Sequence, residues 1–154
     1  MTHAPRWLEP LLRQLEAEAP ADTLLLAPDD HPLTETLRRR LPGTALTTAA
    51  PGDLPDRRFA LAIVVETLES LPEADARVLL AGLRDLKARH VVLLADLARS
   101  PLTESALRAL GFHLHARDGG QTLFGFELYG YKDRPEWLSP SHWAHPERWD
   151  KFRW

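Results

Sequence analysis

The chain has 154 residues, of which 44% are hydrophobic and 27% are charged, and it carries a formal net charge of −3 at pH 7. These proportions are typical of one folded globular domain and exclude a disordered chain. The absence of cysteine excludes disulfides, thiolate catalysis and cysteine-ligated metal sites, and the negative charge provides no general attraction to nucleic acid or anionic lipid.

Helical and strand patterns alternate from the N-terminus to residue 110. Apolar residues recur at helical spacing in four segments, which predict helices over 5–19, 33–41, 73–88 and 100–110. Short apolar segments predict strands over 23–27, 44–48, 59–65 and 91–95. The segment FALAIVV at 59–65 has the strongest strand signal, so we expect it at the centre of the sheet. The third helix should bury one stripe of side chains, namely Ala76, Leu79, Leu80, Leu83 and Leu86.

The pattern changes after Gly111. Apolar and polar residues alternate over 112–117 and again over 121–131, and the sequence Asp118-Gly119-Gly120 between them is typical of a hairpin turn. Strands that alternate with helices form parallel units with right-handed crossovers. We therefore expect residues 1–131 to form a three-layer α/β domain, reduced in size, whose mostly parallel sheet ends in an antiparallel hairpin.

Polar residues follow the predicted strands directly. Ligands of open α/β sheets bind outside the carboxyl ends of the strands, where the strand order reverses. The residues expected at that rim are Asp29, Asp30, His31, Thr47, Thr48, Glu66, Thr67 and Asp96. Converging carboxylates can bind a cation or the amino group of a ligand, and Glu66 or Glu69 near His31 can perform acid–base chemistry. The same residue types also cap helices, so both interpretations stay open.

The longest recognisable segment is FALAIVVETLESLPEADARVLLAGLRDLKARHVVLL, which is followed by LRALGF. It is similar to the later strands and helices of class I S-adenosylmethionine-dependent methyltransferases, and the resemblance covers residues 23–131. The resemblance implies a Rossmann-like sheet, S-adenosylmethionine as the cofactor and transfer of a methyl group. The chain also resembles a small bacterial family of methyltransferase-like proteins with a tryptophan-rich C-terminus.

The sequence departs from the methyltransferase pattern at the cofactor loops. The glycine-rich first loop of that family falls on residues 27–31, where Pro28 and Pro32 remove backbone N–H groups. The ribose-binding acid falls on Thr47 or Thr48, and the segment 49–58 leaves no room for the third strand. The first functional hypothesis is therefore a degenerate methyltransferase-like fold that acts as a non-catalytic binding or protein-interaction module.

The second hypothesis is an active, divergent S-adenosylmethionine-dependent methyltransferase that uses Asp29, Asp30 and Glu66 around a cleft. The residues alone leave enzymatic activity and the cofactor open. The two hypotheses differ in whether an adenosyl ligand binds, which a titration can measure.

Four of the five tryptophans lie in the segment 132–154, at Trp137, Trp143, Trp149 and Trp154. Each can bury on the order of 200 Å². We expect this segment either to form an ordered strap on the same domain or to dock a protein partner or a second copy of the chain. Basic residues beside the tryptophans suit single-stranded nucleic acid, but neighbouring acids cancel most of their charge, so we expect no nucleic-acid partner.

The histidines do not form a recognisable metal motif. His113 and His115 are two residues apart on the predicted hairpin, and His142 and His145 are three apart in the tail, with no third ligand at a fixed spacing. We therefore predict no metal site. The N-terminus lacks the apolar run of a secretory signal, and no segment approaches the roughly 20 apolar residues of a spanning helix, so we expect a cytoplasmic protein without membrane contact.

Overall fold

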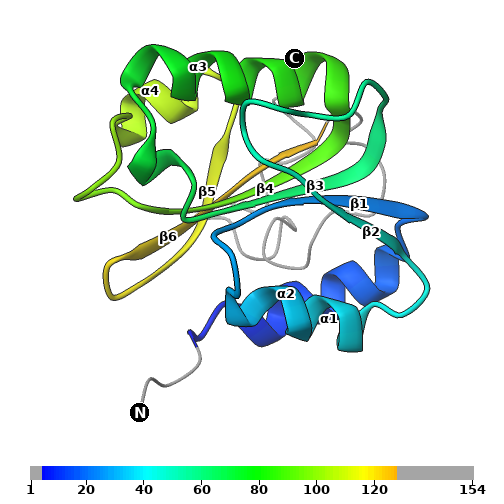
Figure 1. The fold of residues 1–154 in the computed structure, drawn as a ribbon. Coiled ribbons are helices and arrows are strands. Elements are labelled where there is room, and N and C mark those ends of the chain that lie inside the picture. The colour runs from blue at the N-terminus through cyan, green and yellow to red at the C-terminus, as the bar shows by residue number, and fades with distance from the viewer. Residues whose placement is uncertain (1–4, 128–154) are drawn as a thin grey trace, which may run out of the picture.

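The computed structural model describes residues 5–127. One six-stranded sheet lies between two layers of helices (Figure 1). Helices α1 (Leu8–Glu18) and α2 (Pro32–Arg40) cover one face, and α3 (Glu73–Gly82) and α4 (Glu104–Ala109) cover the other. The predicted three-layer α/β fold is confirmed. The tryptophan-rich segment 132–154, with its predicted strap and docking roles, lies outside the described residues.

The strand order places a topological switch point beside β1. The strands are β1 (Asp22–Leu26), β2 (Ala45–Thr48), β3 (Phe59–Val65), β4 (Ala88–Asp96), β5 (His113–Asp118) and β6 (Gln121–Glu127). Their order in the sheet is β2-β1-β3-β4-β6-β5, in which β1 to β4 are parallel and β6 is antiparallel to both β4 and β5. The order reverses between β1 and β3, so the carboxyl ends of these two strands are where a ligand is expected.

The sheet separates two apolar cores, and β3 contributes to both. Leu61, Ile63 and Val65 face the core under α1 and α2. Ala62 and Val64 face the core under α3 and α4. A strand covered on both faces must be apolar at every position, which explains the continuous run of β3 and confirms its central place.

Leu86 is exposed, which contradicts the predicted stripe of the third helix. Helix α3 ends at Gly82, and the chain continues as a π-helical turn, η2 (Leu83–Lys87). The wider π turn rotates the following side chains away from the α-helical stripe. Leu83 therefore stays fully buried, whereas 66% of Leu86 is exposed.

Two further local predictions were wrong. The helix predicted from Ser100 begins at Glu104, because the hydroxyl of Thr103 caps it by accepting a hydrogen bond from the backbone N–H of Ala106. In β5 a bulge shifts the register between Leu114 and Ala116. These two residues consequently pack toward opposite cores and do not share the face that simple alternation predicts.

None of the helices within residues 5–127 has the length and apolar character needed to cross a bilayer. The short 3₁₀ helix η1 (Leu68–Ser70) completes the described elements and leads from the end of β3 toward α3.

Candidate functional site

The loops after β1 and β3 meet at the switch point. His31 Nε2 lies 3.5 Å from Glu66 Oε2. Asp30 and Glu66 both adopt left-handed backbone conformations, with φ of 60° and 49°. This region is uncommon for residues that carry a side chain, and such backbones concentrate at functional sites. The backbone thus has an unusual conformation on both sides of the crevice.

Several of the backbone donors after β1 are used within the loop itself. The N–H of His31 donates to Pro28 O at 3.2 Å, and the N–H of Thr34 donates to His31 O at 3.0 Å. His31 Nδ1 accepts from the N–H of Leu33 at 3.1 Å and so caps α2. Pro28 and Pro32 have no N–H to offer. The start of α2 therefore provides few free donors for the phosphate, sugar or carboxylate groups that helix N-termini commonly bind.

A pocket of about 180 Å³ opens beside these loops, at the carboxyl end of β4. Its lining consists of Pro28, Glu66, Glu69, Leu94, Ala95, Asp96, Arg99 and Gln121. Three carboxylates thus face one guanidinium group. Small-molecule sites are typically roughly 300–1,000 Å³, so this pocket suits a single charged group better than a whole nucleoside.

One carboxylate oxygen of Glu69 lacks a hydrogen-bond donor among the described residues. Its Oε1 accepts a hydrogen bond from the N–H of Asp96 at 2.8 Å. Its Oε2 is buried and has no hydrogen-bond donor among the described residues. A buried acceptor without a donor costs about 1–3 kcal/mol, so a donor brought by a ligand would be favourable there.

The structure brings part of the predicted rim together. Glu66 and Asp96 line the pocket with Glu69, and His31 contacts Glu66. Gln121 extends this group, because its Nε2 reaches Glu66 Oε1 at 3.5 Å.

Other predicted rim residues have different places. Thr67 is buried, and its hydroxyl lies 3.1 Å from the carbonyl oxygens of Leu26 and Val65, where it ties the ends of β1 and β3 together. Asp29, Asp30 and Thr48 are exposed and Thr47 is half-buried, and these four residues do not line the pocket.

Sequence reasoning missed Arg99 and Gln121. Gln121 opens β6 and is paired with Asp96 across the antiparallel ladder, and Arg99 follows Asp96 in a tight turn. The sequence offers one signal for each residue. Arg99 closely follows Asp96 along the chain, and the predicted hairpin can bring Gln121 back beside the strand that ends at Asp96.

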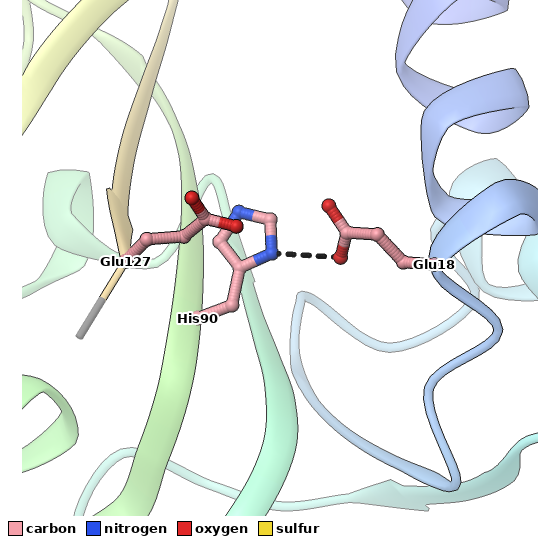
Figure 2. Close-up of side chains that lie close together, drawn as sticks. All are labelled: Glu18, His90 and Glu127. Atoms are coloured by element: carbon pink, nitrogen blue, oxygen red, sulfur yellow. Dashed lines mark hydrogen bonds and ion pairs between the residues drawn. The ribbon is translucent and has the colours of Figure 1, made fainter. Parts of the chain in front are cut away.

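A second group of polar side chains lies toward the opposite end of β4. Figure 2 shows Glu18, His90 and Glu127 pointing toward one another from α1, β4 and β6. His90 and Glu127 are cross-strand partners, and His90 Nδ1 lies 3.0 Å from Glu18 Oε2. One potential ligand atom from each residue lies within 4.8 Å of the other two.

The charges of this second group are unevenly balanced. Burial acts to raise the pKa of Glu18, but the hydrogen bond and charge of His90, together with the hydrogen bond from Gln14, outweigh it and hold the pKa below its ordinary value. Burial raises the pKa of Glu127; the imidazole of His90 opposes this shift, and the carboxylate of Glu18 adds to it. Two carboxylates therefore compete for one imidazole.

Comparison with known proteins identifies both a family and a fold. Residues 5–154 match the model of DUF6231, which is described as a family of unknown function. A search of the curated proteins found no significant match.

Several solved methyltransferase structures resemble the chain. The methyltransferase domain of bacterial CtHen1 has a TM-score of 0.56 at 11% identity, covering 79% of this chain and 97% of that one. An O-methyltransferase family protein from Burkholderia thailandensis has a TM-score of 0.56 at 11% identity, covering 79% of this chain and 56% of that one. Magnesium protoporphyrin IX methyltransferase from Synechocystis PCC 6803, solved with bound S-adenosylmethionine, has a TM-score of 0.53 at 12% identity, covering 78% and 77%.

At these identities the likeness shows the fold alone. The chain has the class I methyltransferase-like fold that its sequence predicted, and it spans only about half the length of several of the structures it resembles.

Proposed function

This chain belongs to DUF6231, a family of unknown function, and we propose that it is a non-catalytic binding module built on the methyltransferase fold. The observation that carries the proposal is the contact between His31 and Glu66. It joins the loops after β1 and β3 across the crevice where ligands of open α/β sheets bind. An adenosyl ligand there would have to separate these side chains.

The loss of backbone donors supports the same proposal. Methyltransferase-like cofactor loops bind the cofactor through main-chain N–H groups that glycines make accessible. In this chain the N–H groups of His31, Leu33 and Thr34 already have acceptors within the loop and the helix cap. At the end of β2, Thr47 and Thr48 offer hydroxyls in place of the carboxylate that would bind a ribose. The adenosyl group thus loses several of its usual donors and its usual acceptor.

The pocket beside the crevice favours a positively charged group. Glu66, Glu69 and Asp96 contribute three carboxylates, and Arg99 contributes the one opposing charge. The free Oε2 of Glu69 is a buried acceptor that an ammonium N–H can satisfy. We therefore assign the pocket to the side-chain ammonium of a lysine on a partner, or to a small amine of the same chemistry.

An NMR titration of the ¹⁵N-labelled full chain tests this assignment. The probe is N-acetyl-lysine amide, and the matched control is N-acetyl-norleucine amide, which has a similar aliphatic chain and lacks the ammonium group. We expect the lysine compound alone to shift the backbone resonances of Glu69, Asp96 and Gln121, and Glu69→Gln to weaken this response. Equal shifts from both compounds, or none at millimolar concentration, would contradict the assignment.

The alternative is an active, divergent S-adenosylmethionine-dependent methyltransferase. Its support is the fold shared with solved methyltransferases, together with the left-handed backbone of Asp30 and Glu66, which is a conformation that glycine commonly supplies. A methyltransferase must bind its cofactor before any transfer, so binding of an adenosyl ligand separates the two functions.

A further inference from the structure

We propose that Glu18, His90 and Glu127 form a binding site for one divalent transition-metal ion, for which Zn²⁺ is the probe. The three residues come from α1, β4 and β6 and converge in Figure 2. The site is independent of the proposed amine pocket, because His90 and Asp96 are six residues apart on β4, which corresponds to about 20 Å.

The three residues carry unbalanced negative charge. Within residues 5–127, neither Glu18 nor Glu127 forms an ion pair with a lysine or arginine. Glu18 is also the last residue of α1, whose last turn has no basic residue. Helix C-termini carry a partial negative charge that disfavours a carboxylate. Two acids and the negative end of a helix thus surround a single imidazole, and a bound cation would stabilise this arrangement.

The spacing of the potential ligand atoms also suits Zn²⁺. Zn²⁺ binds histidine nitrogen and carboxylate oxygen at about 2.0–2.2 Å, which separates neighbouring ligand atoms by roughly 3–3.6 Å. His90 Nδ1 and Glu18 Oε2 are 3.0 Å apart, close to that separation. The oxygen of Glu127 lies within 4.8 Å of the other ligand atoms, and its flexible side chain can close the difference of about 1 Å. The ion would replace the hydrogen that His90 and Glu18 share.

The surroundings hold two of the three ligands in place. Side chains of His90 and Glu18 are only 12% and 25% exposed. Glu18 Oε1 accepts a hydrogen bond from Gln14 Nε2 at 3.0 Å, which leaves Oε2 directed at His90. Hydrogen bonds of this kind orient metal-binding side chains and contribute to metal affinity.

The donor set selects the class of metal. Imidazole nitrogen with carboxylate oxygen suits Zn²⁺ and the neighbouring transition metals, whereas Mg²⁺ and Ca²⁺ prefer oxygen ligands alone. Three protein ligands leave a fourth position for water or another ligand. We therefore expect Zn²⁺ and Co²⁺ to bind and Mg²⁺ not to compete.

Calorimetric titration of the tag-free full chain with Zn²⁺ tests the site. The expected result is one ion per chain, with at least a tenfold loss of affinity in both His90→Gln and Glu127→Gln. His113→Gln is the matched control, because it removes an exposed histidine from the same sheet and should leave the affinity unchanged. The double variant His142→Gln/His145→Gln controls for the histidines of the tail and should also bind as the wild type does.

Three results would overturn the proposal: no saturable binding of Zn²⁺, binding that His90→Gln and Glu127→Gln leave intact, or binding that disappears in the tail variant. Circular dichroism should confirm that each variant is folded. If His90→Gln does not fold, Glu18→Gln replaces it with the same expected loss. Visible absorption of bound Co²⁺ gives a second readout, which should change in Glu127→Gln and not in His113→Gln.

Discussion

His31 contacts Glu66 across the switch point through Nε2 and, through Nδ1, caps helix α2. Because Nδ1 accepts a hydrogen bond from Leu33, the proton of the neutral imidazole is on Nε2 and faces the carboxylate. One side chain therefore both occupies the crevice and stabilises the helix behind it. A ligand that displaces His31 must also remove the cap of α2.

The cap can be separated from the crevice contact by substitution. His31→Ala should lower the free energy of unfolding by about 1 kcal/mol, because the N–H of Leu33 loses its acceptor. His31→Asn is the control, since asparagine caps helices well yet is too short to reach Glu66, and it should unfold in urea as the wild type does. Equal stability of all three proteins would show that Nδ1 does not cap the helix.

Leu83 and Leu86 test the π-helical turn. Leu83→Ala should cost about 2–5 kcal/mol, because its side chain is completely buried. Leu86→Ala should change stability by less than about 0.5 kcal/mol, because 66% of that residue is exposed. Urea unfolding measures both variants. Similar losses in the two would indicate that the helix continues without the π turn and buries both leucines.

His115 should make stability depend on pH. Burial, followed by the charges of His90 and His113, lowers the pKa of His115 to about 4. The folded chain therefore keeps this imidazole neutral, while the unfolded chain protonates it near pH 6.5. The contribution of this pKa difference to the free energy of unfolding is fully present above pH 6.5 and decreases as the pH falls toward 4. The decrease amounts to about 2 kcal/mol between pH 7.5 and 5.

Replacement of His115 measures this contribution. In the wild type the imidazole of His115 lies so close to Gly125 that a side chain on that glycine would collide with the ring. His115→Phe keeps an aromatic ring at this place. The variant should lose less stability than the wild type between pH 7.5 and 5, as followed by urea unfolding at each pH. His113→Phe leaves the burial of His115 intact and removes only the smallest of the three causes of its low pKa, so it should keep most of the wild-type dependence. The same pH dependence in His115→Phe would contradict the assignment.

The tryptophan-rich segment gives a separate prediction. If it packs on the domain, a chain that ends at Tyr131 should melt at a lower temperature or aggregate, because apolar surface becomes exposed. Each kcal/mol lost corresponds to about 2–4 °C in a chain of this size. Size-exclusion chromatography of both forms tests the predicted homodimer. Unchanged melting together with solvent-exposed tryptophan fluorescence would favour an external partner over a strap.

Sequence patterns predicted the fold because the pattern of apolar residues in each helix and strand reflects which of its faces is buried. The apolar run of β3 is visible at every position, and Leu33, Leu37 and Leu41 repeat at helical spacing and are all buried. Leu86 and the bulge near His115 could not be predicted in this way, because the π turn and the register shift depend on packing against the sheet. The preferences of single residues for helix or strand encode neither the π turn nor the register shift.

The candidate sites were predictable only where a topological rule applies. Glu66 and Asp96 follow strands directly, so the rule for open α/β sheets places both at the rim, and both line the pocket. Glu18 and His90 are 72 positions apart in the sequence. Nothing in the spacing of these residues connects them, because the end of α1 meets β4 only after the layers have packed.

The most direct test of the central claim is a calorimetric titration of the full chain with S-adenosylhomocysteine. We expect no saturable binding at ligand concentrations up to about 1 mM, which corresponds to a binding free energy weaker than about −4 kcal/mol. A dissociation constant in the micromolar range or below, in a complex where the ligand bonds to main-chain nitrogens after β1, would contradict it.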